Sequence, residues 1–249
     1  MNPPIVLITG GSRGIGAATA LLVAQRGFAV AINYARQADV AHQLVQRIQA
    51  QGGRAMAVQA DVGEEAQVLR MFAEVDAKFG RLSALVNNAG FVDMKARLDE
   101  MSFERLDRMM RINVVGAFVC AREAVRRMST RHGGSGGVIV NLSSAAARIG
   151  SPDQYIDYAA SKGAIDTLTV GLAKEVAEEG IRVNGVRPGL IDTEIHASGG
   201  DADRAFQLAH TVPMKRTGTA QEIANAIVWL MSDEASYVTG TTIDVTGGR

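Results

Sequence analysis

The sequence predicts an α/β fold built on one doubly wound parallel sheet of about seven strands, with helices on both faces. Short β-branched runs alternate with longer helical patterns along the whole chain, and most of these runs are continuously apolar. Strands buried on both faces have this composition, and regular β–α alternation gives right-handed crossovers within one sheet. A glycine-rich turn directly after the first run is a third indication. At 249 residues and 47 % hydrophobic content, the chain can bury a sizeable core.

Strands are predicted wherever a short run rich in β-branched and small apolar residues stands between turn residues. In chain order these runs are Ile5–Thr9, Phe28–Asn33, Arg54–Gln59, Ala84–Asn87, Gly137–Leu142, Ile181–Val186 and Thr241–Val245. Helices are predicted between the runs, where the pattern is longer and helical. They cover Gly14–Arg26, Val40–Gln51, Glu64–Phe79, Phe103–Thr130, Tyr155–Glu179 and Ala220–Ser232.

No linker divides the chain, so we expect a single domain over residues 1–249. The segment Gly133–Gly137 has a linker-like composition, but it leads straight into a predicted strand and is interpreted as a tight turn. The longest interval without a predicted element is Pro188–Thr219. Loops of this length often cover functional sites, which predicts a substrate lid at about residues 189–218.

Composition and charge exclude several classes of function. Lys plus Arg and Asp plus Glu number 26 each, so no strong field favours a nucleic acid. The N-terminal residues lack the basic region of a signal peptide, and no uncharged apolar run is long enough to cross a membrane. Cys120 is the only cysteine, which excludes an internal disulfide and fits a reducing, cytoplasmic compartment.

The glycine-rich turn predicts a Rossmann-type phosphate site. It runs from Thr9 to Gly16, with glycines at positions 10, 11, 14 and 16, and it joins the first strand to the first helix. Glycine allows a tight turn and a close approach of backbone to a diphosphate, and the helix N-terminus supplies free N–H groups. The spacing is G-x-x-x-G-x-G rather than G-x-G-x-x-G, and only its place after the first strand makes it specific.

The end of the second strand predicts which nicotinamide cofactor is bound. Folds that bind NAD place an acidic residue there, but this chain has Asn33-Tyr34-Ala35-Arg36. Arg13 lies in the glycine loop, and two guanidinium groups at this corner would bind a 2′-phosphate well. We therefore predict NADP(H) over NAD(H). The alternative is that Arg36 is a solvated loop residue.

Tyr158 and Lys162 are candidates for acid–base chemistry. They stand four residues apart in a predicted helix, so their side chains share one face. The positive charge of a lysine favours the phenolate and would lower the pKa of the tyrosine, which could then give and take a proton. Tyr and Lys at this spacing more often face solvent, so the other motifs must show whether this pair is catalytic.

With these motifs in chain order, the sequence closely resembles the short-chain dehydrogenase/reductase family from Ile5 to Gly248. Besides TGGSRGIG and YAASK, the resemblance rests on the motifs that follow successive strands. They are Asp61-Val62, Asn87-Asn88-Ala89-Gly90, Asn113 in a long helix, Asn141-Leu142-Ser143-Ser144 and Arg187-Pro188-Gly189. The family fold is a seven-stranded parallel sheet with helices on both faces.

The resemblance implies a catalytic set. Tyr158 resembles the general acid/base, and Lys162 the residue that lowers its pKa and binds the nicotinamide ribose. Asn113 resembles the asparagine that supports a water link from the lysine to solvent. The serine has two candidates, because Ser144 fits when counted from the strand but lies fourteen residues before Tyr158, one more than in relatives. We choose Ser144 over Ser143 and place the extra residue in the loop at 154–157, since strand-end geometry is harder to alter and successive residues there point opposite ways.

The resemblance also implies a cofactor-binding set along the strand ends. The implied residues are Gly10, Ser12, Arg13, Gly14, Ile15, Gly16, Tyr34, Arg36, Asp61, Val62, Asn88, Ala89, Gly90, Tyr158, Lys162, Pro188, Gly189, Ile191 and Thr193. Asp61 would meet the adenine, and the segment from Pro188 to Thr193 would hold the nicotinamide. Asp61 has an alternative role as the N-cap of the following helix.

The expected reaction is hydride transfer between NADP(H) and a small-molecule carbonyl or secondary alcohol, as in a carbonyl reductase. A 3-oxoacyl thioester is one candidate substrate, although Glu179 stands where reductases of this kind place a basic residue and would repel an acidic carrier protein. A sugar or polyol dehydrogenase, resembling glucose 1-dehydrogenases, is the alternative. Its hydroxyls would meet the polar residues of the lid and the preceding loop, which are Arg148, Gln154, Tyr155, Asp192, Glu194, His196 and Ser198.

The sequence also bears on metal binding, on a non-catalytic role and on assembly. No metal site is expected, because His196 has no second ligand at metal-binding spacing. A catalytically silent NADP-binding regulator is a remote alternative, since such proteins typically lose the tyrosine or the lysine. The helices Phe103–Thr130 and Tyr155–Glu179 are apolar or small around much of their circumference, which predicts burial in a homo-oligomer, a homotetramer by resemblance.

Overall fold

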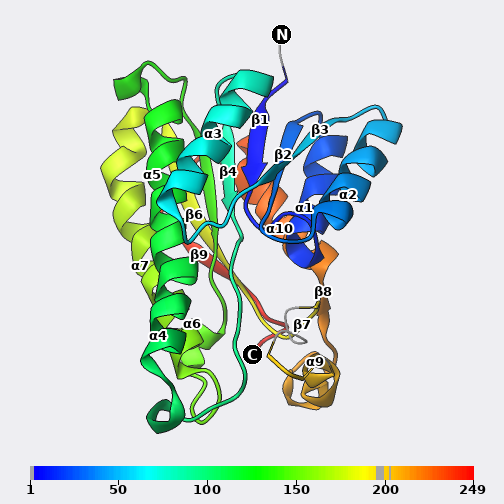
Figure 1. Cartoon of the computed structure of the whole chain (residues 1–249), viewed down its shortest axis with the longest axis vertical. Helices are drawn as coiled ribbons and strands as arrows, with labels where there is room; N and C mark the ends of the chain where they lie inside the picture. Colours follow the sequence, from blue (N-terminus) through cyan, green and yellow to red (C-terminus); the bar gives the residue numbers. More distant parts are fainter. Residues whose placement is uncertain (1–2, 195–198, 202) are drawn as a thin grey trace.

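The computed structural model describes residues 3–194, 199–201 and 203–249, and it confirms the predicted fold class. Seven parallel strands form one sheet in the order β3-β2-β1-β4-β5-β6-β9. The strands are β1 (Ile5–Ile8), β2 (Ala29–Tyr34), β3 (Arg54–Gln59), β4 (Ala84–Asn87), β5 (Gly137–Leu142), β6 (Ile181–Pro188) and β9 (Thr242–Val245). The long helices are α1 (Gly14–Gln25), α2 (Ala38–Ala50), α3 (Glu65–Phe79), α4 (Phe103–Met110), α5 (Gly116–Met128), α7 (Ile156–Val176) and α10 (Ala220–Met231). Figure 1 shows these helices on the two sides of the sheet.

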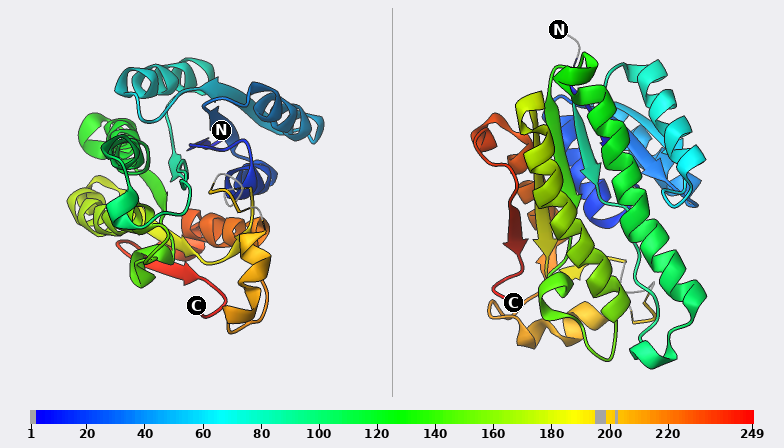
Figure 2. Two further views of the ribbon diagram at one scale, coloured as in Figure 1. Left: turned by 60° about the horizontal axis from the view of Figure 1, so that its bottom comes forward. Right: turned by 90° about the vertical axis from the view of Figure 1, so that its left-hand side faces the viewer.

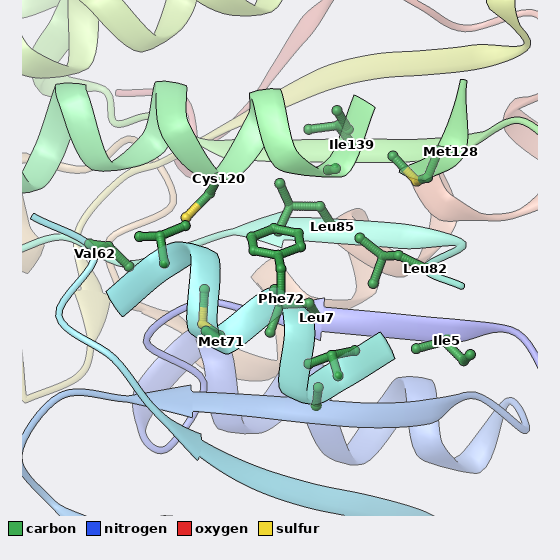
Figure 3. Packing of buried hydrophobic residues seen from close by; sticks show 14 of the residues in the cluster. Ile5, Leu7, Val62, Met71, Phe72, Leu82, Leu85, Cys120, Met128 and Ile139 are labelled. Carbon is green, nitrogen blue, oxygen red and sulfur yellow. The ribbon is translucent and has the colours of Figure 1, made fainter. Parts of the chain in front are cut away.

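Alternate residues of each strand point to opposite faces of the sheet, and each face has its own core. Ile5 and Leu7 of β1 pack with α3, α5 and α7, whereas Val6 and Ile8 pack with α1, α2 and α10. Phe72 of α3 is fully buried in the first core. Figure 3 shows its ring between the helices and the sheet, close to Leu85 of β4. Both faces of the sheet are therefore covered, as its continuous apolar strands require.

The order of the strands places a crevice at one end of the sheet. The chain runs outward in one direction from β1 to β2 and β3, and in the other from β4 to β9. In doubly wound sheets, ligands bind outside the carboxyl ends of the strands at such a change of direction. The loops after β1 and β4 flank this point, and the glycine-rich turn and the Asn88–Gly90 motif lie on them.

The predicted helix Phe103–Thr130 differs most from the structure. It is divided into α4 and α5 by one wider π-helical turn at Arg111–Val115, which contains Asn113. Such a turn inserts an extra residue into a helix and often occurs at functional sites. Phe103 to Met128 therefore stays helical, but the face that each residue presents changes at this turn.

The predicted lid contains short elements rather than one long loop. The paired strands β7 (Ile191–Asp192) and β8 (Gly218–Thr219) and the short helix α9 (Arg204–Gln207) lie in this interval. Its polar candidates His196 and Ser198 fall outside the described residues. A short helix, α6 (Ala146–Ile149), which the sequence did not predict, precedes α7. No helix in the described ranges is long and apolar enough to cross a membrane.

Candidate active site

Tyr158 and Lys162 lie one turn apart on α7 and line the same cavity at the carboxyl end of the sheet. The Lys162 side chain is buried, which excludes an ordinary solvent-facing pair. Its Nζ donates a hydrogen bond of 2.8 Å to the Leu142 carbonyl and lies 5.6 Å from the centre of the Tyr158 ring. Burial lowers the pKa of Lys162 to about 8, against the opposing effect of the Asp166 charge.

The protonation of Tyr158 differs from the sequence-based expectation. Burial raises the pKa of Tyr158 above its ordinary value, and a hydrogen bond with Ser144 acts in the opposite direction. Burial of the phenol is the largest influence on this pKa, so its net direction is opposite to the lowering that the sequence predicted. At neutral pH the residue is thus a neutral phenol, the form that a proton donor needs.

The two adjacent serines after β5 have different surroundings. Ser143 is buried, and its hydroxyl donates to the Lys162 carbonyl at 3.1 Å. The Ser144 hydroxyl accepts from the Ala146 N–H at 3.1 Å and hydrogen-bonds Tyr158. Successive residues at a strand end point to opposite sides, and here Ser144 points toward the tyrosine.

Asn113 lies behind the cavity rather than in its wall. Its side-chain amide pairs with Phe91, where Oδ1 accepts from the backbone N–H at 3.0 Å and Nδ2 donates to the carbonyl at 2.9 Å. A Cβ added to Gly90 would lie 3.4 Å from both Asn113 Oδ1 and Lys162 Nζ. Asn113 therefore fixes the segment after β4 and sits beside the lysine, at the place where the wider helical turn brings it inward.

The glycine-rich turn forms a cradle of bare backbone. Gly10 and Gly14 have φ of 58° and 52°, in the left-handed region that side chains disfavour. A Cβ at Gly16 would lie 2.6 Å from the Gly10 carbonyl, so no larger residue fits. Buried Asn33 accepts from the Gly10 N–H at 3.0 Å, and the Asn88 amide donates to the Gly10 carbonyl at 3.0 Å. These contacts shape the loop for a close approach by phosphate.

The predicted cofactor residues gather around two cavities that share Asn88, Gly90 and Val92. The first cavity also contains Ile15, Tyr158, Lys162, Pro188, Gly189, Ile191 and Thr193. The second contains Gly10, Ser12, Arg13, Tyr34, Arg36, Asp61, Val62 and Ala89. Gly14 and Gly16 are in neither wall and act through the shape of the turn. The chain's own residues thus fit an elongated dinucleotide that reaches from Arg36 to Tyr158.

The charged residues of the second cavity leave room for a phosphate. Arg13 lies 3.9 Å from Glu194, and both side chains are exposed, so this ion pair contributes little. Arg36 has no ion pair within the described residues. Asp61 accepts from the Gly63 N–H at 2.9 Å, whereas the N-cap of α3 is Glu64. The alternative of Asp61 as a helix cap is therefore wrong.

Several residues near Tyr158 were not singled out by the sequence. Arg105 of α4 donates to both carboxylate oxygens of buried Asp157, at 2.8 and 3.2 Å, and Asp157 accepts from the Tyr158 N–H at 2.9 Å. This bidentate contact fixes the first turn of α7 and hence the position of Tyr158. Arg204 and Arg249 line the first cavity. The only sequence signal for Arg204 is that it is a basic residue in an otherwise acidic stretch of the predicted lid.

No group of three potential ligands of the His, Cys, Asp or Glu type gathers within the described part of the chain. The site residues brought together are instead a phenol, a hydroxyl and an ammonium group beside a glycine cradle. This set can move a proton at an oxygen atom and bind a phosphate.

Comparison with known families places the chain among oxidoreductases. The family model described as Enoyl-(Acyl carrier protein) reductase matches residues 10–249. The uncharacterized oxidoreductase YgfF of Escherichia coli is 55 % identical, over 98 % of this chain and 99 % of its own length. A 3-oxoacyl-[acyl-carrier-protein] reductase, FabG of Staphylococcus epidermidis, is 38 % identical over 97 % of each chain. At a similar level, 39 %, stands 3beta-hydroxysteroid dehydrogenase 1 of Eggerthella lenta, over 98 % of this chain and 92 % of its own length.

Solved structures agree with this placement. A short-chain dehydrogenase/reductase of Serratia marcescens is 34 % identical with a TM-score of 0.90, and the match covers 99 % of this chain and 98 % of the other. A short chain dehydrogenase of Burkholderia cenocepacia, in complex with NADP, has the same identity, TM-score and coverage. Relatives that act on a carrier-bound acyl group and on a steroid are about equally similar, so overall identity does not select a substrate.

Proposed function

The chain belongs to the short-chain dehydrogenase/reductase family of oxidoreductases, and from this premise we propose that it is an NADP(H)-dependent carbonyl reductase. The proposal assigns acid–base chemistry to Tyr158, with Ser144, Lys162 and Asn113 as its partners. The observation that carries it is that Tyr158, Ser144 and Lys162 line one cavity, and that this cavity adjoins the one beside the glycine cradle.

In the proposed reduction, the carbonyl oxygen of the substrate accepts hydrogen bonds from the Ser144 and Tyr158 hydroxyls. NADPH, when bound, supplies the hydride that the carbonyl carbon receives. Tyr158 gives its proton to the oxygen as negative charge develops there, so no unsupported alkoxide forms. Lys162, held by the Leu142 carbonyl, stabilises the tyrosinate that remains. Asn113 lies beside Lys162 and supports the return of a proton from solvent.

The preference for NADPH over NADH gives a first prediction. Arg13 and Arg36 line the cavity where the resemblance places the adenosine ribose, and neither is held by a strong ion pair in the described residues. We expect wild-type kcat/KM to be higher with NADPH. Replacing both arginines with Ala should lower the NADPH value by at least about tenfold, the order of one lost charged hydrogen bond, and leave the NADH value nearly unchanged. A higher wild-type kcat/KM with NADH would contradict the assignment.

The walls of the first cavity favour a carbonyl compound with an apolar body, as in a 3-oxoacyl thioester or a simple ketone. Apolar side chains there include Val92, Leu142, Ile149 and Leu190. An acidic carrier protein is disfavoured, because Glu179 would repel it. Arg131, which resembles the other basic position of such reductases, lies 3.9 Å from Glu179, so its charge is partly compensated.

The sugar or polyol alternative has weaker support. Asp192 and Glu194 are exposed and outside the cavity wall, and Arg148 is paired with Asp244. A non-catalytic regulator has the least support, because the tyrosine and lysine are both present. The test of function is a panel of 3-oxoacyl thioesters, ketones, quinones, aldoses and polyols with NADPH or NADP. We expect turnover of carbonyl compounds, and turnover of aldoses and polyols alone would favour the alternative.

We also propose that the single domain assembles as a homotetramer in a reducing, cytoplasmic compartment. Figure 2 shows α5 and α7 side by side on a face that no other element of the described residues covers. Val115, Phe118 and Val170 are exposed there, and covering them would bury apolar area. Cys120 is a free, buried thiol, as a reducing compartment favours. Light scattering should give the mass of four chains, and a monomer at assay concentration would contradict the assembly.

A further inference from the structure

Two arginines line the cavity that contains Tyr158 and Ser144. Arg204 belongs to α9, and Arg249 follows β9. Figure 1 shows α9 and the C-terminal end of the chain at the same end of the molecule, beside β7. Both arginine side chains are partly buried. Segments that are far apart in sequence thus bring two guanidinium groups into one small space.

Neither arginine has a carboxylate partner among the described residues. The Arg204 guanidinium donates to Gln154 Oε1 at 2.5 Å and lies 5.2 Å from the centre of the Tyr155 ring. Arg249 has no hydrogen bond or ion pair within the described ranges. No Asp or Glu is among the described residues that line this cavity.

The neighbouring arginines show that this lack of pairing is local. Arg148 and Arg216 line an adjoining cavity that also contains Arg249. Arg148 pairs with Asp244, and Arg216 pairs with Glu222 at 2.6 Å. Arg148 and Arg216 are therefore paired with carboxylates, whereas no described Asp or Glu pairs with Arg204 or Arg249.

The two guanidinium groups also affect each other. Burial lowers the pKa of Arg249, and the positive charge of Arg204 lowers it further. Two like charges in a partly buried space raise the free energy of the folded state unless an anion compensates them. A bound carboxylate or phosphate would accept hydrogen bonds from both planar groups.

We infer that the substrate of this cavity carries a compact anionic group, a carboxylate or a phosphate, which Arg204 and Arg249 bind while its carbonyl group faces Ser144 and Tyr158. The carbonyl half of this statement rests on the proposed function, but the anion half does not. Because the remaining walls are largely apolar, the part of the substrate between the two groups is a hydrocarbon.

Paired aldehydes test the inference by turnover. With NADPH, kcat/KM for 4-carboxybenzaldehyde should exceed that for its methyl ester, methyl 4-formylbenzoate, by at least about tenfold in the wild-type protein. In the variant R204Q/R249Q this ratio should fall to about one, because kcat/KM for 4-carboxybenzaldehyde falls while that for the methyl ester is unchanged. The single variant R249Q replaces a guanidinium group that makes no hydrogen bond or ion pair with the described residues. A lower ratio in R249Q could therefore not be explained by a disturbed local fold. R216Q is the matched control, since its charge is already compensated, and should keep the wild-type ratio.

Binding of unreactive anions tests the inference without turnover. Benzoate should bind the NADP-loaded protein at least about tenfold more tightly than benzamide, and R204Q/R249Q should abolish the difference in calorimetric titrations. Phenyl phosphate in place of benzoate decides between a phosphate and a carboxylate. Equal binding of benzoate, phenyl phosphate and benzamide by the wild-type protein would overturn the inference. If discrimination is found but neither aldehyde is reduced, the anion site stands and the proposed function falls.

Discussion

Replacing Tyr158 with Phe is expected to lower kcat by about 10² to 10⁴, the usual contribution of a positioned general acid. The change removes only the hydroxyl that Ser144 hydrogen-bonds and that would protonate the substrate oxygen. The ring stays in place, and Lys162 keeps its hydrogen bond to Leu142. The Kd for NADPH should therefore change little, and the loss should appear in kcat. Steady-state kinetics and a fluorescence titration of NADPH measure the two quantities.

Tyr155→Phe is the matched control for this change. Tyr155 lines the same cavity, only three residues earlier, and the substitution removes the same hydroxyl group. We expect Tyr155→Phe to keep kcat within a few-fold of wild type, because its hydroxyl makes no hydrogen bond among the described residues and its ring keeps the contact with Arg204. If Tyr158→Phe retained most of the activity, Tyr158 would not be the proton donor.

Replacing Ser144 with Ala should lower kcat by about 10² to 10³, the effect of losing one hydrogen-bond donor to a developing oxyanion. The physical reason is that, although Ser143 and Ser144 both line the cavity, Ser144 is the one that hydrogen-bonds Tyr158. NADPH binding should be unaffected. Single-turnover measurements at saturating NADPH would place the loss in the chemical step.

Ser143→Ala is the control for Ser144→Ala and also tests the choice between the two residues. Its hydroxyl donates to the Lys162 carbonyl, so we expect a loss of about 1 kcal/mol in unfolding free energy and a largely unchanged kcat. The reverse result, with activity lost in Ser143→Ala and kept in Ser144→Ala, would reject the serine assignment.

The sheet was predictable because its strands are buried on both faces and bounded by turn residues. β3, β4 and β5 have the predicted bounds, and β1, β2, β6 and β9 differ by one or two residues at one or both ends. The glycine cradle was also predictable, since φ values near those of Gly10 and Gly14 leave few other residue types. Both features depend on local backbone constraints, which a short stretch of sequence is enough to predict.

Features that depend on tertiary contacts were not predictable. The sequence around the wider turn at Arg111–Val115 has an ordinary helical pattern. The function of this turn is seen only in the structure, where Asn113 hydrogen-bonds the backbone of Phe91. The direction of the Tyr158 pKa was wrong because the sequence shows the nearby Lys162 charge but not the burial of the phenol. Arg204 and Arg249 come from segments 45 residues apart, and no local signal joins them.

The most direct test of the central claim uses NADPH deuterated at C4 of the nicotinamide on the face that transfers hydride. If the cavity around Tyr158 catalyses hydride transfer, mass spectrometry of the product alcohol should find deuterium on its carbinol carbon for at least one carbonyl compound of the panel. The same incubation with Tyr158→Phe should give little labelled alcohol. Wild-type protein that binds NADPH but transfers deuterium to no carbonyl compound, with either labelled face, would contradict the account.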